Sequence, residues 1–270
     1  MLKNLMELQV VLVVLILCGC ANPYAKYYRD LTNGTDFINN PNFEITNGPP
    51  RLIITDNPAE SALKLREDGY LPLGFSSFWA RDLSESKAIK HGEQIKASIV
   101  LFFKKYRNTE SGSIPLTLPS TQTSNSSYSG NIYGTGGNAS FYGSGTTTTY
   151  GTQTTYIPYE HDYYDYAVSY WIKQKNFRLG AVVIDLSNDD KMAIGSNKGV
   201  KVDVVVKNTP AYNADILRGD LIKKIEDDPV LDITSFQKHI VKNEGKIVKI
   251  TLIRNGQEIT KKVNIDKVMK

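Results

Sequence analysis

The stretch of residues 209–222 reads TPAYNADILRGDLI, and it specifies much of its own local structure. Pro210 suits the first turn of a short helix, because proline fixes φ and its missing N–H is not needed there. Ala211 and Ala214 are small enough for that helix to lie close to a sheet, and Gly219 permits a sharp turn. The pattern therefore predicts a short helix that packs on a sheet and then turns directly into a buried strand.

The flanking sequence predicts further strands around this helix and turn. An apolar, β-branched run at 199–206 precedes it, and a helix is expected over 233–243. Two strands, 247–254 and 257–265, are joined by Asn255-Gly256, which is the strongest two-residue hairpin signal. The last hundred residues therefore predict a β-rich domain with two helices.

Together with the segment 177–182, FRLGAV, this order of motifs resembles a bacterial PDZ domain of the kind appended to HtrA-type serine proteases and site-2 metalloproteases. The resemblance covers 177–267, about one third of the chain, and departs from the usual pattern where Asp227-Asp228 replaces Asn-Gly. It implies a partly open β-barrel with two helices. The fold class expected for the whole chain is α+β.

The resemblance also implies a peptide groove. Leu179 and Gly180 would offer backbone N–H groups to a peptide carboxylate, and 181–184 would accept the peptide as an added strand beside the 233–243 helix. Arg178 either adds charge to carboxylate capture or is solvated, and His239 either bonds a peptide side chain or packs on the core. The implied peptide-binding residues are Arg178, Leu179, Gly180, Ala181, Val182, Val183, Ile184, Phe236, His239 and Ile240.

Residues 50–176 predict a small α/β domain. Strands are expected at 52–55, 70–78 and 96–106, with one helix after Asn57 that ends at Gly69 and a second over 84–91 that ends at Gly92. The segments 69–78 and 98–101 resemble uncharacterised Gram-negative PDZ-containing lipoproteins, a resemblance that carries no known chemistry.

A low-complexity insertion interrupts this domain at 111–159. It contains no charged residue and is rich in Ser, Thr, Gly and Tyr, so the expectation is a disordered or weakly ordered loop. Its recurrent tyrosines leave two alternatives open, a marginal hairpin and a sticky recognition or aggregation element. The strand expected at 163–173 would pair with 96–106, which makes the insertion one long excursion between sheet neighbours.

The N-terminus predicts an export signal. Residues 10–17 are apolar but too few to span a bilayer, and 17–20, LCGC, resembles the lipobox of bacterial lipoproteins. Removal of residues 1–19 as a signal peptide would leave a lipid-modified Cys20 at the start of a tether over 20–49. Ala21 favours an outer-membrane location facing the periplasm. The alternatives are an ordinary secretory signal and an uncleaved hydrophobic anchor.

Composition and motifs exclude several function classes. The net charge of +4 makes no case for nucleic-acid binding, and the three histidines fall in no protease or zinc motif. No enzyme activity, cofactor or metal is therefore expected. The sequence indicates a membrane-anchored, non-catalytic protein that binds C-terminal or strand-like segments of envelope proteins. The alternative is an accessory or regulatory subunit of an envelope protease or secretion system.

Overall fold

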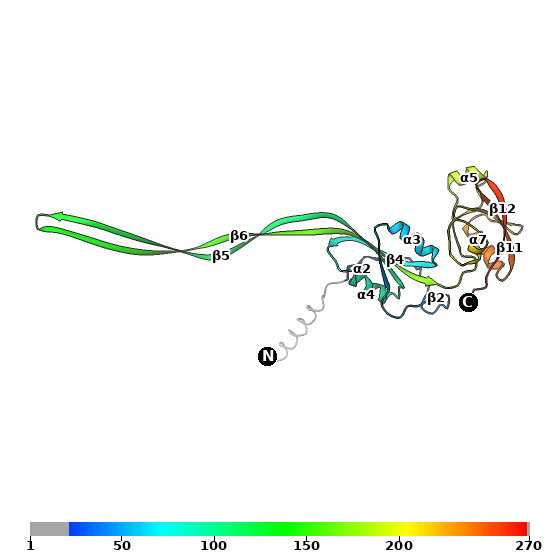
Figure 1. Cartoon of the computed structure of the whole chain (residues 1–270), viewed down its shortest axis with the longest axis horizontal. Coiled ribbons are helices and arrows are strands. Elements are labelled where there is room, and N and C mark those ends of the chain that lie inside the picture. The colour runs from blue at the N-terminus through cyan, green and yellow to red at the C-terminus, as the bar shows by residue number, and fades with distance from the viewer. Residues whose placement is uncertain (1–21, 269–270) are drawn as a thin grey trace, which may run out of the picture. The chain divides into compact units, whose positions relative to one another are not determined.

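The computed structural model describes residues 22–268 and arranges them in two six-stranded sheets with associated helices (Figure 1). The expected signal peptide and Cys20 lie outside the described residues. Within 22–268, none of the helices has the length and apolar character needed to cross a bilayer.

The N-terminal sheet is mixed. Its strand order is β1-β4-β6-β5-β3, with β2 paired to β6; β3 runs parallel to β5, with Leu52 opposite Val100, whereas β1 pairs antiparallel with β4. β5 and β6 are adjacent, which confirms the predicted pairing across the insertion. The elements are α2 (Pro23–Lys26), β1 (Tyr28–Asp30), β2 (Phe43–Glu44), β3 (Arg51–Ile54), α3 (Pro58–Glu67), β4 (Tyr70–Arg81), α4 (Ser86–Gln94), β5 (Ile99–Gly134) and β6 (Gly137–Gln174).

The tether predicted for 20–49 is wrong over much of its length. Tyr24 is fully buried in the core of this domain, where its ring packs edge-on against Phe78 and Tyr166. Tyr24 lies in α2, which is capped by Asn22, whose side chain accepts a hydrogen bond from the Tyr24 N–H. β1 and β2 then join the sheet, so residues 22–44 belong to the folded domain.

The end predicted for the second helix is also wrong. α4 continues through Gly92 to Gln94. A side chain at position 92 would place its Cβ 2.8 Å from Val100 Cγ2 and 2.9 Å from Pro50 Cγ. Gly92 therefore allows α4 to pack closely on the sheet and does not end the helix.

The insertion at 111–159 is not a loop in the structure. Its residues continue β5 and β6 as two paired strands that lie side by side up to a two-residue turn at Thr135-Gly136 (Figure 1). Residues 106–163 form a compact unit distinct from the rest of the chain. The marginal hairpin left open by the sequence is therefore the observed arrangement.

The C-terminal sheet has the order β12-β11-β9-β8-β7, with β10 paired to β9, and no closed barrel forms. The predicted strands, the helix at Pro210 and the Asn255-Gly256 hairpin are confirmed, but α5 was not expected. The helix α5 begins at a capping box formed by Ser187 and Asp190. The elements are β7 (Ala181–Ile184), α5 (Asn188–Ile194), β8 (Val200–Val205), α6 (Pro210–Asn213), β9 (Leu221–Ile225), β10 (Asp228–Pro229), α7 (Ile233–Lys242), β11 (Ile247–Arg254) and β12 (Gln257–Asn264).

Candidate functional site: a groove beside the edge strand β7

β7 is the last strand of the C-terminal sheet. It pairs antiparallel with β8 on one side, and within residues 22–268 no strand pairs with its other side. Its sequence, Ala-Val-Val-Ile, carries neither a charge nor a proline. An edge of this kind presents a row of backbone donors and acceptors to any extended chain that comes alongside.

The turn before β7 is held by its carbonyl groups. The Leu179 carbonyl accepts a 2.8 Å hydrogen bond from the Ala211 N–H, and the Gly180 carbonyl accepts one of 2.8 Å from the Val206 N–H. In a trans peptide the N–H points opposite to the preceding carbonyl. The N–H groups of Gly180 and Ala181 are therefore directed away from α6 and β8. In this orientation they can donate hydrogen bonds to an anion.

Gly180 is required by the conformation of this turn. Its φ of +78° lies in the left-handed region, and a Cβ there would stand 2.1 Å from Thr209 Oγ1. Thr209 is itself buried and donates a 2.6 Å hydrogen bond to the Val206 carbonyl. The turn is thus pressed against Thr209, and this contact fixes the direction of its N–H groups.

The opposite wall of the groove is α7. Asp232 caps this helix by accepting a 2.7 Å hydrogen bond from the Ser235 N–H, while Phe236 and Ile240 are buried one turn apart. A cavity of about 490 Å³ lies between this wall and β7. Its lining consists of Gln174, Asn176, Phe177, Arg178, Leu179, Gly180, Ala181, Val182, Phe236, Gln237, Ile240, Val241 and Val268.

The cavity brings together seven of the ten residues expected in the peptide groove, from Arg178 to Val182 with Phe236 and Ile240. Val183 lies outside the lining and packs against the core, and Ile184 is 43% exposed at the far end of β7. Gln237 and Val241 were missed, although their spacing of four residues places them on one helix face.

His239 does not face the cavity, which corrects its expected place in the groove. Its Nε2 lies 3.2 Å from the Pro229 carbonyl oxygen and its Nδ1 lies 3.7 Å from Asp228 Oδ2. The ring therefore packs toward β10. This position is nearer to the expected packing role than to contact with a peptide.

The charge of Arg178 is compensated. Its guanidinium pairs with Glu244, and its backbone carbonyl accepts a 2.9 Å hydrogen bond from the Asp266 N–H. Arg178 thus lines the cavity as one half of an ion pair and is not a freely solvated cation. The segment that follows β12 also reaches this region, because Val268 contributes to the lining.

The described residues provide no metal centre: among 22–268, no three His, Cys, Asp or Glu side chains gather into a group suited to hold an ion. The groove itself presents backbone groups, apolar side chains and the polar side chains of Gln174, Asn176, Arg178 and Gln237.

Comparison with known proteins identifies this part of the chain. Residues 178–265 match the PDZ domain family and form a PDZ domain. No curated protein matches the chain. Similar solved structures include the HtrA3 PDZ domain bound to a phage-derived ligand (FGRWV), which is 17% identical over 33% of this chain and 84% of that chain, with a TM-score of 0.30.

A second similar structure is the HtrA-type protease AlgW with a decapeptide. It is 19% identical over 36% of this chain and 36% of its own, with a TM-score of 0.29. The similarity thus spans about a third of the protease chain.

Proposed function

We propose that the protein is a membrane-anchored, non-catalytic lipoprotein whose PDZ domain captures C-terminal or strand-like segments of cell-envelope proteins. The observation that carries the proposal is the pair of N–H groups at Gly180 and Ala181, directed away from β8 at the start of β7, whose other edge is unpaired within residues 22–268. A peptide carboxylate binds to these N–H groups, and the residues before it add a strand to β7.

The cavity beside β7 supplies the specificity. Phe236 and Ile240 make the α7 wall apolar, so the groove accepts an apolar C-terminal side chain. Because the Arg178 charge is already paired with Glu244, the carboxylate is held chiefly by backbone N–H groups. Binding of this kind is moderate in affinity and tolerant of sequence, as suits a protein with several partners.

Anchoring through Cys20 rests on the sequence. A groove attached to a membrane meets partners confined to the same surface at a raised effective concentration, so moderate affinity suffices. Radiolabelled palmitate incorporation into the full chain, with Cys20→Ser as the control, tests this part. Incorporation that persists in Cys20→Ser contradicts it.

The peptide-binding part is tested with a ligand selected by the full chain from a phage-displayed library of C-terminally free peptides. The selected peptide is synthesised with a free and with an amidated C-terminus, and binding is measured by fluorescence anisotropy. We expect amidation to weaken binding by about tenfold or more, the loss of a charged hydrogen bond. Gly180→Glu should weaken binding at least as much, because a side chain there displaces the turn from Thr209. Gly256→Glu is the matched control, because Gly256 has nearly the same φ, +79°, but no atom near its absent Cβ. Binding that survives both amidation and Gly180→Glu refutes carboxylate capture.

A further inference from the structure

The insertion at 111–159 forms a two-stranded ribbon with one fixed register, consisting of residues 111–134 of β5 and 137–159 of β6. Cross-strand hydrogen bonds join Thr117 to Thr154 at 2.9 Å, Ser126 to the Gly145 carbonyl at 3.3 Å and Asn131 to Ser140 at 2.8 Å. These pairs all fit the register set by the two-residue turn, so no residue is inserted between them.

Aromatic rings cover glycines across this ribbon. Tyr159 lies over Gly112, Phe141 over Gly130 and Tyr128 over Gly143, with ring atoms 2.3 to 2.8 Å from where a Cβ would stand. An aromatic side chain opposite a glycine stabilises a strand pair that would otherwise lack side-chain contact. The sequence of the ribbon is therefore written for this register and is not merely low in complexity.

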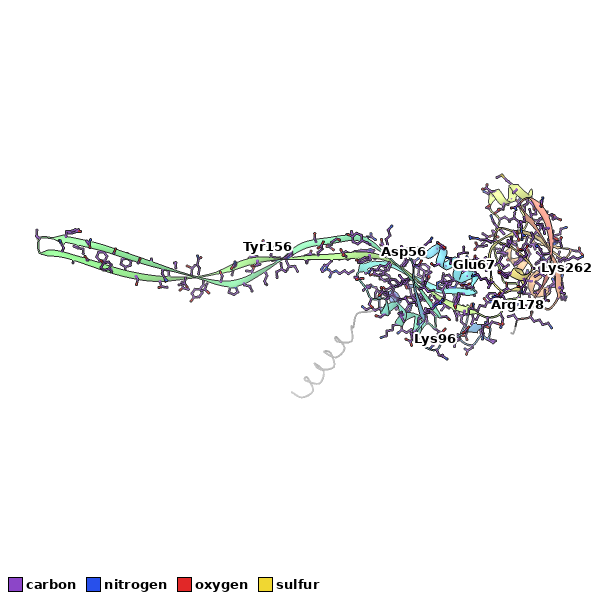
Figure 2. All side chains as sticks on the ribbon, viewed as in Figure 1. Asp56, Glu67, Lys96, Tyr156, Arg178 and Lys262 are labelled. Atoms are coloured by element: carbon purple, nitrogen blue, oxygen red, sulfur yellow. The ribbon has the colours of Figure 1, made fainter. Side chains whose placement is uncertain are left out.

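The register separates the ribbon into two different faces. Because paired residues point to the same side and alternate along each strand, even positions of β5 share a face with odd positions of β6. We call this the aliphatic face; its large apolar residues are Ile114, Leu116, Leu118, Tyr128, Ile132, Phe141, Ile157 and Tyr159. The other face presents Tyr133, Tyr142, Tyr150 and Tyr156 among Ser, Thr and Asn side chains. Figure 2 shows side chains standing out along the ribbon, with Tyr156 labelled.

The aliphatic face lacks a cover within the described residues. Ile114, Leu118 and Ile132 are 58%, 52% and 61% exposed. A two-stranded sheet is marginally stable in water unless such a face is packed against another layer. The ribbon thus requires an occupant for this face.

The edges of the ribbon carry prolines at the end away from the turn, whereas residues 120–134 and 137–157 contain none. Pro115, Pro119 and Pro158 have no N–H, and all three fall on pairs of the face opposite the aliphatic one. In an intact antiparallel ladder these are the pairs whose N–H groups point outward, so proline interrupts the donor row of both edges. At that end of the ribbon, the prolines favour packing through a face over pairing through an edge.

The area of the aliphatic face and the absence of charge in the ribbon limit what can cover this face. About 24 residues per strand rise about 80 Å, and two strands present a face about 10 Å wide, which gives roughly 800 Å². A stable protein interface buries roughly this area on each partner. No residue of 111–159 is charged, so a second identical ribbon meets no repulsion, while a charged partner or an anionic lipid surface finds no counterion.

We propose that the aliphatic face of the ribbon packs against the same face of a second copy of this chain. The apolar side chains fall in two groups, one at 114–118 with Ile157 and one at 128–132 with Phe141, separated by a Ser/Thr/Gly stretch. Such a face complements itself about a twofold axis, which is the usual symmetry of a homodimer.

The test compares two neighbouring substitutions in the full-length Cys20→Ser protein, so that no lipid is attached. Ile157→Asp places a charge on the aliphatic face, whereas Tyr156→Asp, one residue earlier and 66% exposed, places the same charge on the other face. Sedimentation velocity in mild detergent should show a dimer whose dissociation constant rises about 10- to 100-fold in Ile157→Asp, as expected for one buried apolar side chain. Tyr156→Asp should change it less than about threefold.

Leu116→Asp is the second variant on the aliphatic face, and protection of β5 and β6 amides against hydrogen exchange reports whether each variant keeps the ribbon. A protein that remains monomeric at about 100 µM, or dimers weakened equally by Ile157→Asp and Tyr156→Asp, overturns the proposal. It is equally overturned if the protein stays monomeric and Ile157→Asp releases it from phosphatidylcholine vesicles, because a lipid surface is then the occupant.

Discussion

Gly180 and Gly256 provide a direct test of how the turn before β7, the proposed carboxylate site, is built. Their φ angles are +78° and +79°, so an alanine at either position pays the same left-handed strain of about 1–2 kcal/mol. Gly256 has open space around its absent Cβ, whereas at Gly180 the Cβ would lie 2.1 Å from Thr209 Oγ1 and 2.3 Å from Thr209 Cβ. Displacing buried Thr209 adds an overpacking cost of about 1–3 kcal/mol. We therefore expect Gly180→Ala to destabilise the PDZ domain by about 2–5 kcal/mol and Gly256→Ala by about 1–2 kcal/mol.

The assay must report on the PDZ domain alone. Both tryptophans, Trp79 and Trp171, lie in β4 and β6, so tryptophan fluorescence follows the other sheet. Hydrogen exchange of peptides from β8 and β9, measured by mass spectrometry against urea concentration, gives the free energy of opening for this domain. Equal losses in the two variants would show that the turn relaxes away from Thr209 and that this contact does not direct the N–H groups.

Three further predictions concern buried or paired charges. Burial lowers the pKa of His91, so below about pH 6.5 the unfolded chain binds a proton that the folded chain does not. The free energy of unfolding should therefore decrease on acidification. Urea titrations between pH 7 and 5 should show a smaller decrease in His91→Phe than in the parent protein. The Lys201 ammonium, 2.8 Å away, and then Ser187 lower the pKa of Asp190 to about 2. The stabilisation from Asp190 is therefore complete above about pH 4 and is lost as the pH falls toward 2. In Asp190→Asn the urea midpoint should depend less on pH over that range. Asp220 is 1% exposed and binds Arg254 through two 2.8 Å hydrogen bonds; Asp220→Ala should cost about 3–5 kcal/mol, measured by exchange of β9 amides, and a loss below 1 kcal/mol would contradict the buried pair.

The PDZ part was predictable because its information is local. Pro210 begins α6, Gly219 has a φ of +95°, and Asn255-Gly256 joins β11 to β12, each as the sequence indicates. The residues of the candidate groove were less predictable from the sequence. His239 shares a helical turn with Phe236 and Ile240, yet the position of β10 draws its ring toward Pro229, and no local pattern reports where β10 lies.

The remaining failures have a common cause in pairing between distant residues. Asn- and Tyr-rich sequence around Tyr24 carries no period, yet Tyr24 is buried by contacts with residues more than fifty positions away. The ribbon likewise appears disordered in composition, because Gly130 and Gly143 weaken a strand when each is considered alone. Only the register reveals that Phe141 and Tyr128 cover them.

The free edge of β7 and the edges of the ribbon differ in their capacity to pair with another strand. β7 is short, apolar and free of proline, and the turn at Gly180 places a donor pair at its start. The ribbon has far longer edges, but Pro115, Pro119 and Pro158 break their donor rows. Under the proposed function, an extended peptide that pairs with β7 also meets the cavity against α7, whose lining would select its side chain. Replacing all three prolines with Thr should remove this distinction, so that the full chain assembles through the ribbon edges. Light scattering of an unstirred solution would detect the assemblies. A triple variant that stays as soluble as the parent would show that the prolines do not prevent pairing through the ribbon edges.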